Sequence, residues 1–360
     1  TVKTIGEYAF YGCTSLANIA IGNSMTSVGE NAFEKCDSLA SICFEDITSW
    51  CGIDGTNNID NSKVYIGDRK LYEITNIVIP DGVTSIGRKA FFGCSSLTSI
   101  TIPDSVTSIG SYAFSGCSNL TSMVIPDSVT SIGYSAFSDC SSLESITIPF
   151  VGTTLNGTED THFGCIFGAP SYSNNSDYVP ASLKDVILTG GDSIGDYAFE
   201  DCNSLTSMVI PDSVTSIGTR AFYGCNNLEG VYITDITMWC AIDFYDYYSN
   251  PLYYAGNLYL DGELVTELVI PDGVTSIDDS AFSGGGSFTS IVIPDSVTSI
   301  GNSAFYNCSS LTNMVIPDSV TSIGSSAFRG CSSLTNIVIP DGVTSIGDYV
   351  FYNCSSLTNM

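Results

Sequence analysis

The feature that most constrains this 360-residue chain is a repeat of 23 residues, which recurs in eleven clear copies. One copy runs from Leu97 to Cys117, and Leu120 begins the next. Its Leu, Ile, Val, Ala, Phe and Cys positions are too many for one short unit to bury alone, so neighbouring units must stack and share a core. The period therefore predicts a solenoid. The repeated cysteines are Cys13, Cys36, Cys94, Cys117, Cys140, Cys202, Cys225, Cys308, Cys331 and Cys354, and Gly285 replaces the cysteine in the remaining copy.

Each part of the unit predicts a local structure. The alternation of apolar residues over 97–102 favours a short strand, which Pro103 ends because proline has no N–H for a β-ladder. A turn follows, and 106–109 predicts a second short extended segment. Gly110 is expected at a corner with positive φ. The Ala-Phe-x-x-Cys spacing over 113–117 predicts one helical or 3₁₀ turn that directs Phe and Cys inward.

Stacked units of this kind predict a right-handed parallel β coil, mainly β, with 23-residue rungs and short helical or 3₁₀ turns. Eleven clear units and about three altered ones make up a single domain over 1–360. Both ends fall within a unit and neither carries a polar cap. We therefore expect a fragment of a longer array, or ends that stack on identical neighbours.

The consensus Ala-Phe-x-x-Cys-x-x-Leu-x-x-Ile-x-Ile-Pro-x-x-Val-x-x-Ile-Gly resembles the BspA-type leucine-rich repeat of bacterial and protist surface proteins. The resemblance covers most of the chain, and it implies a leucine-rich-repeat solenoid. Members of this family are mostly cell-surface or secreted proteins, and some are adhesins that bind matrix or serum proteins. The resemblance thus implies an extracellular or cell-surface location and offers no catalytic motif.

Three enlarged repeats, 42–79, 150–191 and 231–269, interrupt the period. The first and third are copies of each other, because the segment around Trp50 matches the segment around Trp239 at a constant offset of 189. Each continues into a predicted β-hairpin. The tryptophans are expected to fill core volume where the repeat widens.

The third enlarged repeat concentrates tyrosines beside carboxylates, a composition that favours binding to a protein or a glycan. The alternative is an insert that packs only on itself. The matching loop of the first copy, 55–61, is polar and has none of these aromatic residues, so a receptor should lose binding when 243–254 is replaced by it. The candidate binding residues are Phe244, Tyr245, Asp246, Tyr247, Tyr248, Tyr253 and Tyr254.

The second enlarged repeat contains the only histidine, His162, which lacks a nearby nucleophile or ligand set and is expected to be structural. The polar segment 171–178 predicts a surface loop. The repeated cysteines follow the same interior pattern as Phe and Leu, so buried thiols are expected. A disulfide such as Cys13–Cys36 is the alternative.

The charge balance narrows the classes of partner. Ten basic against 38 acidic residues give a net charge of -28, which disfavours nucleic acid and anionic lipid. No run of 18 apolar residues predicts a membrane span, and neither an enzyme, a cofactor nor a metal site is expected. We therefore predict an extracellular adhesin-like module that binds a protein or glycan. The alternative is a structural protein that self-associates end to end.

Overall fold

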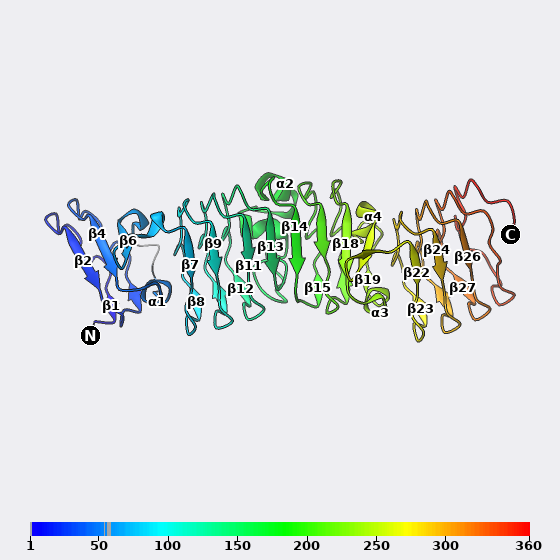
Figure 1. The fold of residues 1–360 in the computed structure, drawn as a ribbon, viewed down its shortest axis with the longest axis horizontal. Helices are drawn as coiled ribbons and strands as arrows, with labels where there is room; N and C mark the ends of the chain where they lie inside the picture. The colour runs from blue at the N-terminus through cyan, green and yellow to red at the C-terminus, as the bar shows by residue number, and fades with distance from the viewer. Residues whose placement is uncertain (1, 54, 56–58) are drawn as a thin grey trace. The chain divides into compact units, whose positions relative to one another are not determined.

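The computed structural model describes residues 2–53, 55 and 59–360, so the predictions for Asp54 and for positions 56–58 of the polar loop lie outside the described residues. The chain is a β-solenoid of about 14 turns with few helices, as predicted. Figure 1 shows strands of successive turns side by side. The chain divides into two compact units, Thr1–Leu183 (unit 1) and Lys184–Met360 (unit 2), which are described separately.

Strands in unit 1 form parallel ladders in which partners lie one rung apart. Ser99 pairs with Asn76, and Ser122 with Ser145, so the sequence period is also the register of the sheet. The strands of unit 1 are β1 (Thr4–Ile5), β2 (Asn18–Ile21), β3 (Ser27–Val28), β4 (Ser41–Phe44), β5 (Val64–Ile66), β6 (Arg69–Lys70), β7 (Asn76–Val78), β8 (Ser85–Ile86), β9 (Ser99–Thr101), β10 (Ser108–Ile109), β11 (Ser122–Val124), β12 (Ser131–Ile132) and β13 (Ser145–Ile148).

Unit 2 repeats this plan, with a ladder of three- and four-residue strands and a ladder of two-residue strands. Its strands are β14 (Asp185–Leu188), β15 (Ser193–Ile194), β16 (Ser207–Val209), β17 (Ser216–Ile217), β18 (Gly230–Ile233), β19 (Asp243–Phe244), β20 (Leu258–Leu260), β21 (Glu263–Leu264), β22 (Glu267–Val269), β23 (Ser276–Ile277), β24 (Ser290–Val292), β25 (Ser299–Ile300), β26 (Asn313–Val315) and β27 (Ser322–Ile323). The predicted hairpins are present, because β5 pairs antiparallel with β6 and β20 with β21.

Short helices occur where the repeat is enlarged. The α-helices are α1 (Ile47–Cys51), α2 (Asn175–Tyr178), α3 (Ile236–Cys240) and α4 (Leu252–Ala255), and the 3₁₀ helices are η2 (Asn61–Lys63), η3 (Leu71–Glu73), η4 (Phe163–Phe167) and η5 (Tyr172–Asn174). The segment 171–178 lies mostly at the surface, as predicted, but it forms η5 and α2 in place of a loop and buries Asn175.

The Ala-Phe-x-x-Cys corner buries Phe and Cys as predicted, but its i→i−3 hydrogen bonds stay separate and do not form a continuous helix. Backbone N–H groups alternate in direction: Ala113 donates to Gly110 in its own turn, whereas Phe114 donates 2.8 Å to Ala136 of the next rung. Every second N–H is thus taken by the neighbour, which prevents a continuous helix. The residue before each Ala adopts positive φ instead, from Tyr8 (52°) to Tyr349 (57°).

The corner glycine serves a different purpose from the predicted one. Gly133 does not have positive φ, but a Cβ there would lie 2.2 Å from the backbone nitrogen of Ser111 in the preceding rung. Gly110 makes the same close approach to Arg88, at 2.5 Å. Glycine therefore recurs because two backbones meet without room for a side chain. Asp278 is the one copy that lacks it.

Inside the corner, phenylalanine rings stack along each run of rungs. Phe114 lies 5.4 Å from Phe91 and 5.5 Å from Phe137 between ring centroids, with interplanar angles of 9° and 4°. All fourteen cysteines are free, and most column thiols donate to the carbonyl of a rung below, as Cys117 does to Phe91 at 3.3 Å. Burial raises the pKa of Cys94 to about 12, so these thiols are poor nucleophiles.

Gly133→Ala tests the close backbone approach. The added methyl should destabilise the chain by about 1–3 kcal/mol, because two rungs must separate to admit it. Gly6→Ala is the matched control, since Gly6 has the same place in its repeat but no atom within 4 Å of a Cβ. Urea unfolding followed by circular dichroism gives both midpoints. Equal midpoints for the two variants would contradict the explanation.

A thiol reagent tests the buried column. In the folded 360-residue chain only exposed Cys13 and part-exposed Cys43 should react, and the twelve buried cysteines should react after denaturation. The physical reason is that a buried thiol neither ionises nor meets the reagent. Ellman's reagent counts the accessible thiols before and after guanidinium is added. Rapid reaction of more than two thiols in the folded chain would show that the column is open.

Candidate functional site

The tyrosine-rich insert of unit 2 is held in place by two buried polar contacts. The Trp239 indole, 1% exposed, donates 2.8 Å to the carbonyl of Ala281. Asn250, fully buried, donates to the same carbonyl at 3.0 Å and to Ser280 at 2.8 Å. Trp50 is fully buried in unit 1, so the expectation that both tryptophans fill the core is confirmed.

The seven predicted binding residues do not share one environment. Phe244 is buried against Trp239, with ring centroids 5.4 Å apart, and is part of the core. Tyr245 is 73% exposed. Asp246 closes the loop by accepting from Ser249 N at 2.7 Å. Phe244, Tyr245 and Asp246 therefore do not form one surface with the four other tyrosines.

Those four tyrosines form one aromatic cluster. Tyr247 lies 4.2 Å from Tyr248 and 5.4 Å from Tyr253, while Tyr253 lies 5.1 Å from Tyr254, all between ring centroids. A hydrogen bond with Tyr248 and burial raise the pKa of Tyr247 well above its ordinary value. Burial does the same for Tyr254. The phenols of Tyr247 and Tyr254 are therefore neutral at physiological pH and present polar tips on an apolar body.

The cluster extends onto regular rungs that the sequence analysis did not single out. Tyr223 packs edge-on against Tyr248 at 5.3 Å, and Tyr306 stacks on Tyr247 at 5.2 Å with an interplanar angle of 22°. Cations border it on both sides, because Arg220 lies 5.3 Å over Tyr223 and Arg329 lies 5.5 Å over Tyr306. We call the whole surface the tyrosine strip: Arg220, Tyr223, Tyr247, Tyr248, Tyr253, Tyr254, Tyr306, Arg329, Tyr349 and Tyr352.

The tyrosine strip contains two of the few basic side chains of unit 2, which is otherwise acidic. Unit 2 carries Lys184, Arg220 and Arg329 as its basic side chains, and both arginines lie on the strip. Arg329 lies over Tyr306, Tyr349 and Tyr352 and forms no ion pair with any described residue. Its five N–H donors are therefore held in place by stacking, without a carboxylate partner.

Two positions of the repeat supply the strip residues that lie on regular rungs. The residues just before Ala and just after Phe point out of the corner, so Arg220 and Tyr223 face the same way in one rung, as do Tyr349 and Tyr352 in another. Reading those two columns of the repeat down the chain could have identified these residues. The insert adds Tyr247 and Tyr248, which pack on Tyr306 and Tyr223 of these columns.

The outward face of the longer-strand ladder in unit 2 is the other broad surface expected from the sequence. Val269, Val292, Val315 and Val338 lie one rung apart, and Val315 is 72% exposed. Beside them Asn359 donates to the Asn336 side chain at 2.8 Å. A hollow of about 740 Å³ lies on this face, lined mainly by aliphatic side chains with Asp295 and Asp318. No aromatic ring lines it, in contrast to the tyrosine strip.

His162 occupies a structural position in the second enlarged repeat. It is 7% exposed, and its Nδ1 lies 3.2 Å from the side-chain oxygen of Asn175. Burial lowers the pKa of His162. Within the described ranges, no group of three or more His, Cys, Asp or Glu side chains could hold a metal ion. Across the same residues, no helix combines the length and apolarity needed to span a bilayer.

Tyr253→Ala and Tyr245→Ala separate the packed part of the insert from its exposed part. Tyr253 contacts four other tyrosines, so its truncation should cost about 2–4 kcal/mol of unfolding free energy. Tyr245 should cost less than about 0.5 kcal/mol because it is exposed. Denaturant midpoints measure both. Equal losses would show that the cluster does not stabilise the insert.

Comparisons with known proteins agree with the repeat. The family model for the BspA type leucine rich repeat region matches in six copies over residues 1–53, 66–164, 177–249 and 257–360. No protein with a curated function matches.

Among solved structures, a leucine-rich repeat protein from Bacteroides ovatus is 28% identical over 99% of this chain and 81% of its own, with a TM-score of 0.46. A leucine rich cell surface protein from Faecalibacterium prausnitzii is 27% identical over 99% and 82%, with a TM-score of 0.30. The family model alone covers most of the sequence, and its repeats coincide with the rungs of the solenoid. The chain belongs to the BspA-type leucine-rich repeat proteins.

Proposed function

We propose that this protein is an extracellular, adhesin-like module that binds a protein or glycan through the tyrosine strip. The observation that carries the proposal is the aromatic and arginine surface formed by the insert and the regular rungs around it. The repeat family supports a protein-interaction module in general terms. The strip adds a location and a chemistry for the contact.

The chemistry of the strip fits a ligand-binding surface. Tyrosine and arginine are enriched among the residues that dominate interface energies, and rigid stacked rings lose little entropy on binding. Tyrosine faces also accept the apolar faces of sugars, while their hydroxyls and the Arg329 guanidinium offer hydrogen bonds. A surface location is supported by the similar Faecalibacterium protein, which is described as a cell surface protein.

Binding to arrayed matrix proteins, serum proteins and glycans tests the proposal with point variants that spare the fold. Tyr306→Ser and Arg329→Ala should each weaken a saturable interaction about tenfold or more, because each removes an anchor of the strip. Tyr8→Ser is the control, since Tyr8 is an exposed tyrosine of unit 1. No saturable binding to any ligand, or equal loss in the control, would refute the proposal.

Exchange of 243–254 for the polar 55–61 segment is a coarser version of the same test, because it also removes buried Phe244 and the packed Tyr253. The point variants therefore carry the interpretation. A fall in binding with an unchanged unfolding midpoint assigns the effect to the surface and not to the core.

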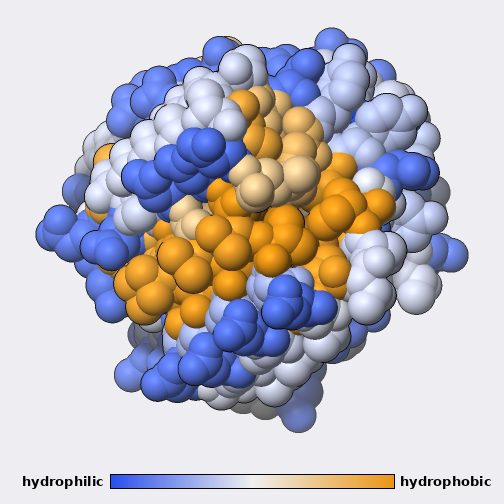
Figure 2. Space-filling view, turned by 90° about the vertical axis from the view of Figure 1, so that its right-hand side faces the viewer, coloured by the Kyte–Doolittle hydropathy of each residue, from blue (hydrophilic) through white to orange (hydrophobic). Residues whose placement is uncertain are grey.

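The alternative proposal is a structural protein that assembles end to end. Figure 2 shows apolar residues gathered on the face that lies at the right-hand side of Figure 1. Stacking on another copy would cover that face. Light scattering on the purified chain separates the alternatives: mass that grows with concentration supports assembly, whereas a constant monomer mass with saturable binding supports the receptor.

A further inference from the structure

The first and third enlarged repeats share a frame of buried polar contacts, one in each unit. In unit 1 the Trp50 indole donates 2.8 Å to the carbonyl of Ala90, as Trp239 does to Ala281 in unit 2. Asn61 corresponds to Asn250 at the offset of 189 and donates to the carbonyl of Lys89 at 3.0 Å. Both asparagines thus hold the corner of the next rung.

Beyond this asparagine the two copies differ in length. Unit 2 has seven residues, 251–257, before β20 begins, whereas unit 1 has two, 62–63, before β5 begins. The longer segment forms α4, which lies on the corner of the next rung: a Cβ on Gly284 would meet Tyr253 Cα at 2.2 Å. A Cβ on the equivalent Gly93 would meet nothing within 4 Å. Among the described residues of unit 1, no element corresponds to α4 and covers this corner.

The side-chain oxygens of Asn250 and Asn61 differ in their hydrogen bonds. In unit 2 the side-chain oxygen of Asn250 accepts the backbone N–H of Leu252 at 2.9 Å, at the start of α4. In unit 1 the corresponding oxygen of Asn61 is buried and has no hydrogen-bond partner among the described residues. A buried acceptor without a donor is costly, so this atom marks an unfilled binding position.

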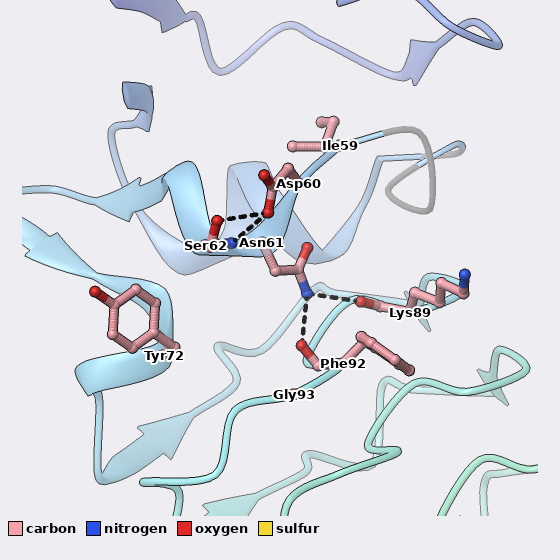
Figure 3. Close-up of a pocket in the computed structure, with 8 residues that line it drawn as sticks. All are labelled: Ile59, Asp60, Asn61, Ser62, Tyr72, Lys89, Phe92 and Gly93. Carbon is pink, nitrogen blue, oxygen red and sulfur yellow. Dashed lines mark hydrogen bonds between the residues drawn. The ribbon is translucent and has the colours of Figure 1, made fainter. Parts of the chain in front are cut away.

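An open pocket of about 510 Å³ occupies that position in unit 1. Figure 3 shows Asn61 reaching across to the carbonyls of Lys89 and Phe92, with the Tyr72 ring on another side. Phe92 is 44% exposed at the pocket, whereas its counterpart Ser283 is fully covered in unit 2. The size lies within the range of ligand pockets. The walls combine the Phe92 and Tyr72 rings with the unpaired Asn61 oxygen, and Asp60, Ser62 and Lys89 also line the pocket.

We propose that this pocket of unit 1 binds a turn of peptide from another protein, in the way that unit 2 binds its own α4. The peptide would donate a backbone N–H to the Asn61 side-chain oxygen, which is covered in the free chain and would turn into the pocket when the peptide binds. Its next side chains, aliphatic or aromatic, would pack on Phe92, Tyr72 and the bare surface of Gly93. The site lies outside the tyrosine strip and does not depend on the function proposed for the strip.

The chain supplies both a probe and its control. The probe is the blocked, fluorescently labelled peptide of residues 251–257, which leaves out Asn250 and its competing acceptor, and its binding to the complete 360-residue protein is followed by anisotropy. We expect saturable one-to-one binding. N-methylation of the peptide Leu nitrogen removes the donor that Asn61 should accept, and it should weaken binding roughly tenfold.

Gly93→Asn tests the site from the protein side. Asparagine is tolerated here, because Asn307 and Asn353 hold the same place in their repeats with φ of 60° and 62°. The new side chain would enter the pocket that Gly93 lines, so binding should be lost while the unfolding midpoint is kept. Gly12→Asn, at the same repeat position but outside the pocket, is the matched control.

The outcomes are distinguishable. Loss of binding in Gly93→Asn alone, together with weaker binding of the N-methyl peptide, supports the proposal. Absence of saturable binding at millimolar peptide overturns it, as does full binding by either Gly93→Asn or the N-methyl peptide. Tyr306→Ser should leave peptide binding unchanged, which separates this site from the tyrosine strip.

Discussion

The close approach of successive backbone rungs determines the rest of this structure. At each corner alternate N–H groups bond to the neighbouring rung, and glycine is required where the two backbones nearly touch. The same spacing brings phenylalanine rings 5.1–5.7 Å apart in the regular stacks and allows thiols to donate to carbonyls one rung away. Core composition, turn geometry and the unreactive cysteines therefore follow from one distance, the separation of neighbouring rungs.

The enlarged repeats show how an insert can interrupt the array without losing its register. A rung contacts only its neighbours, so an insert must return the chain to register within a single turn. In both duplicated repeats a tryptophan and an asparagine do this by bonding to the carbonyls of the following corner. These contacts leave the following segment free to vary in length. In unit 2 that segment covers the next corner with α4, and in unit 1 the equivalent corner faces a pocket.

Much of the fold could be predicted from the sequence, because period, strand alternation, hairpins and the buried tryptophans are local or periodic signals. The helical turn predicted for the corner forms only in part, since alternate N–H groups donate to another rung. The positive φ expected for Gly110 was wrong for the same reason, because the clash that this glycine avoids is between rungs. Tyr306 and Arg329 escaped notice because their contacts with the insert join segments far apart in the sequence.

The tyrosine strip has a mechanical consequence. Its residues come from several rungs, from Arg220 through the insert to Tyr352, and the contact of Tyr247 with Tyr306 already passes over the rung of Phe282. A chain of this design yields to pulling by peeling one rung at a time from an end. A ligand that spans the strip would tie several rungs together, so that force on the protein would have to break ligand contacts and rung contacts at once. Occupancy of the strip would then make the array harder to unravel under tension.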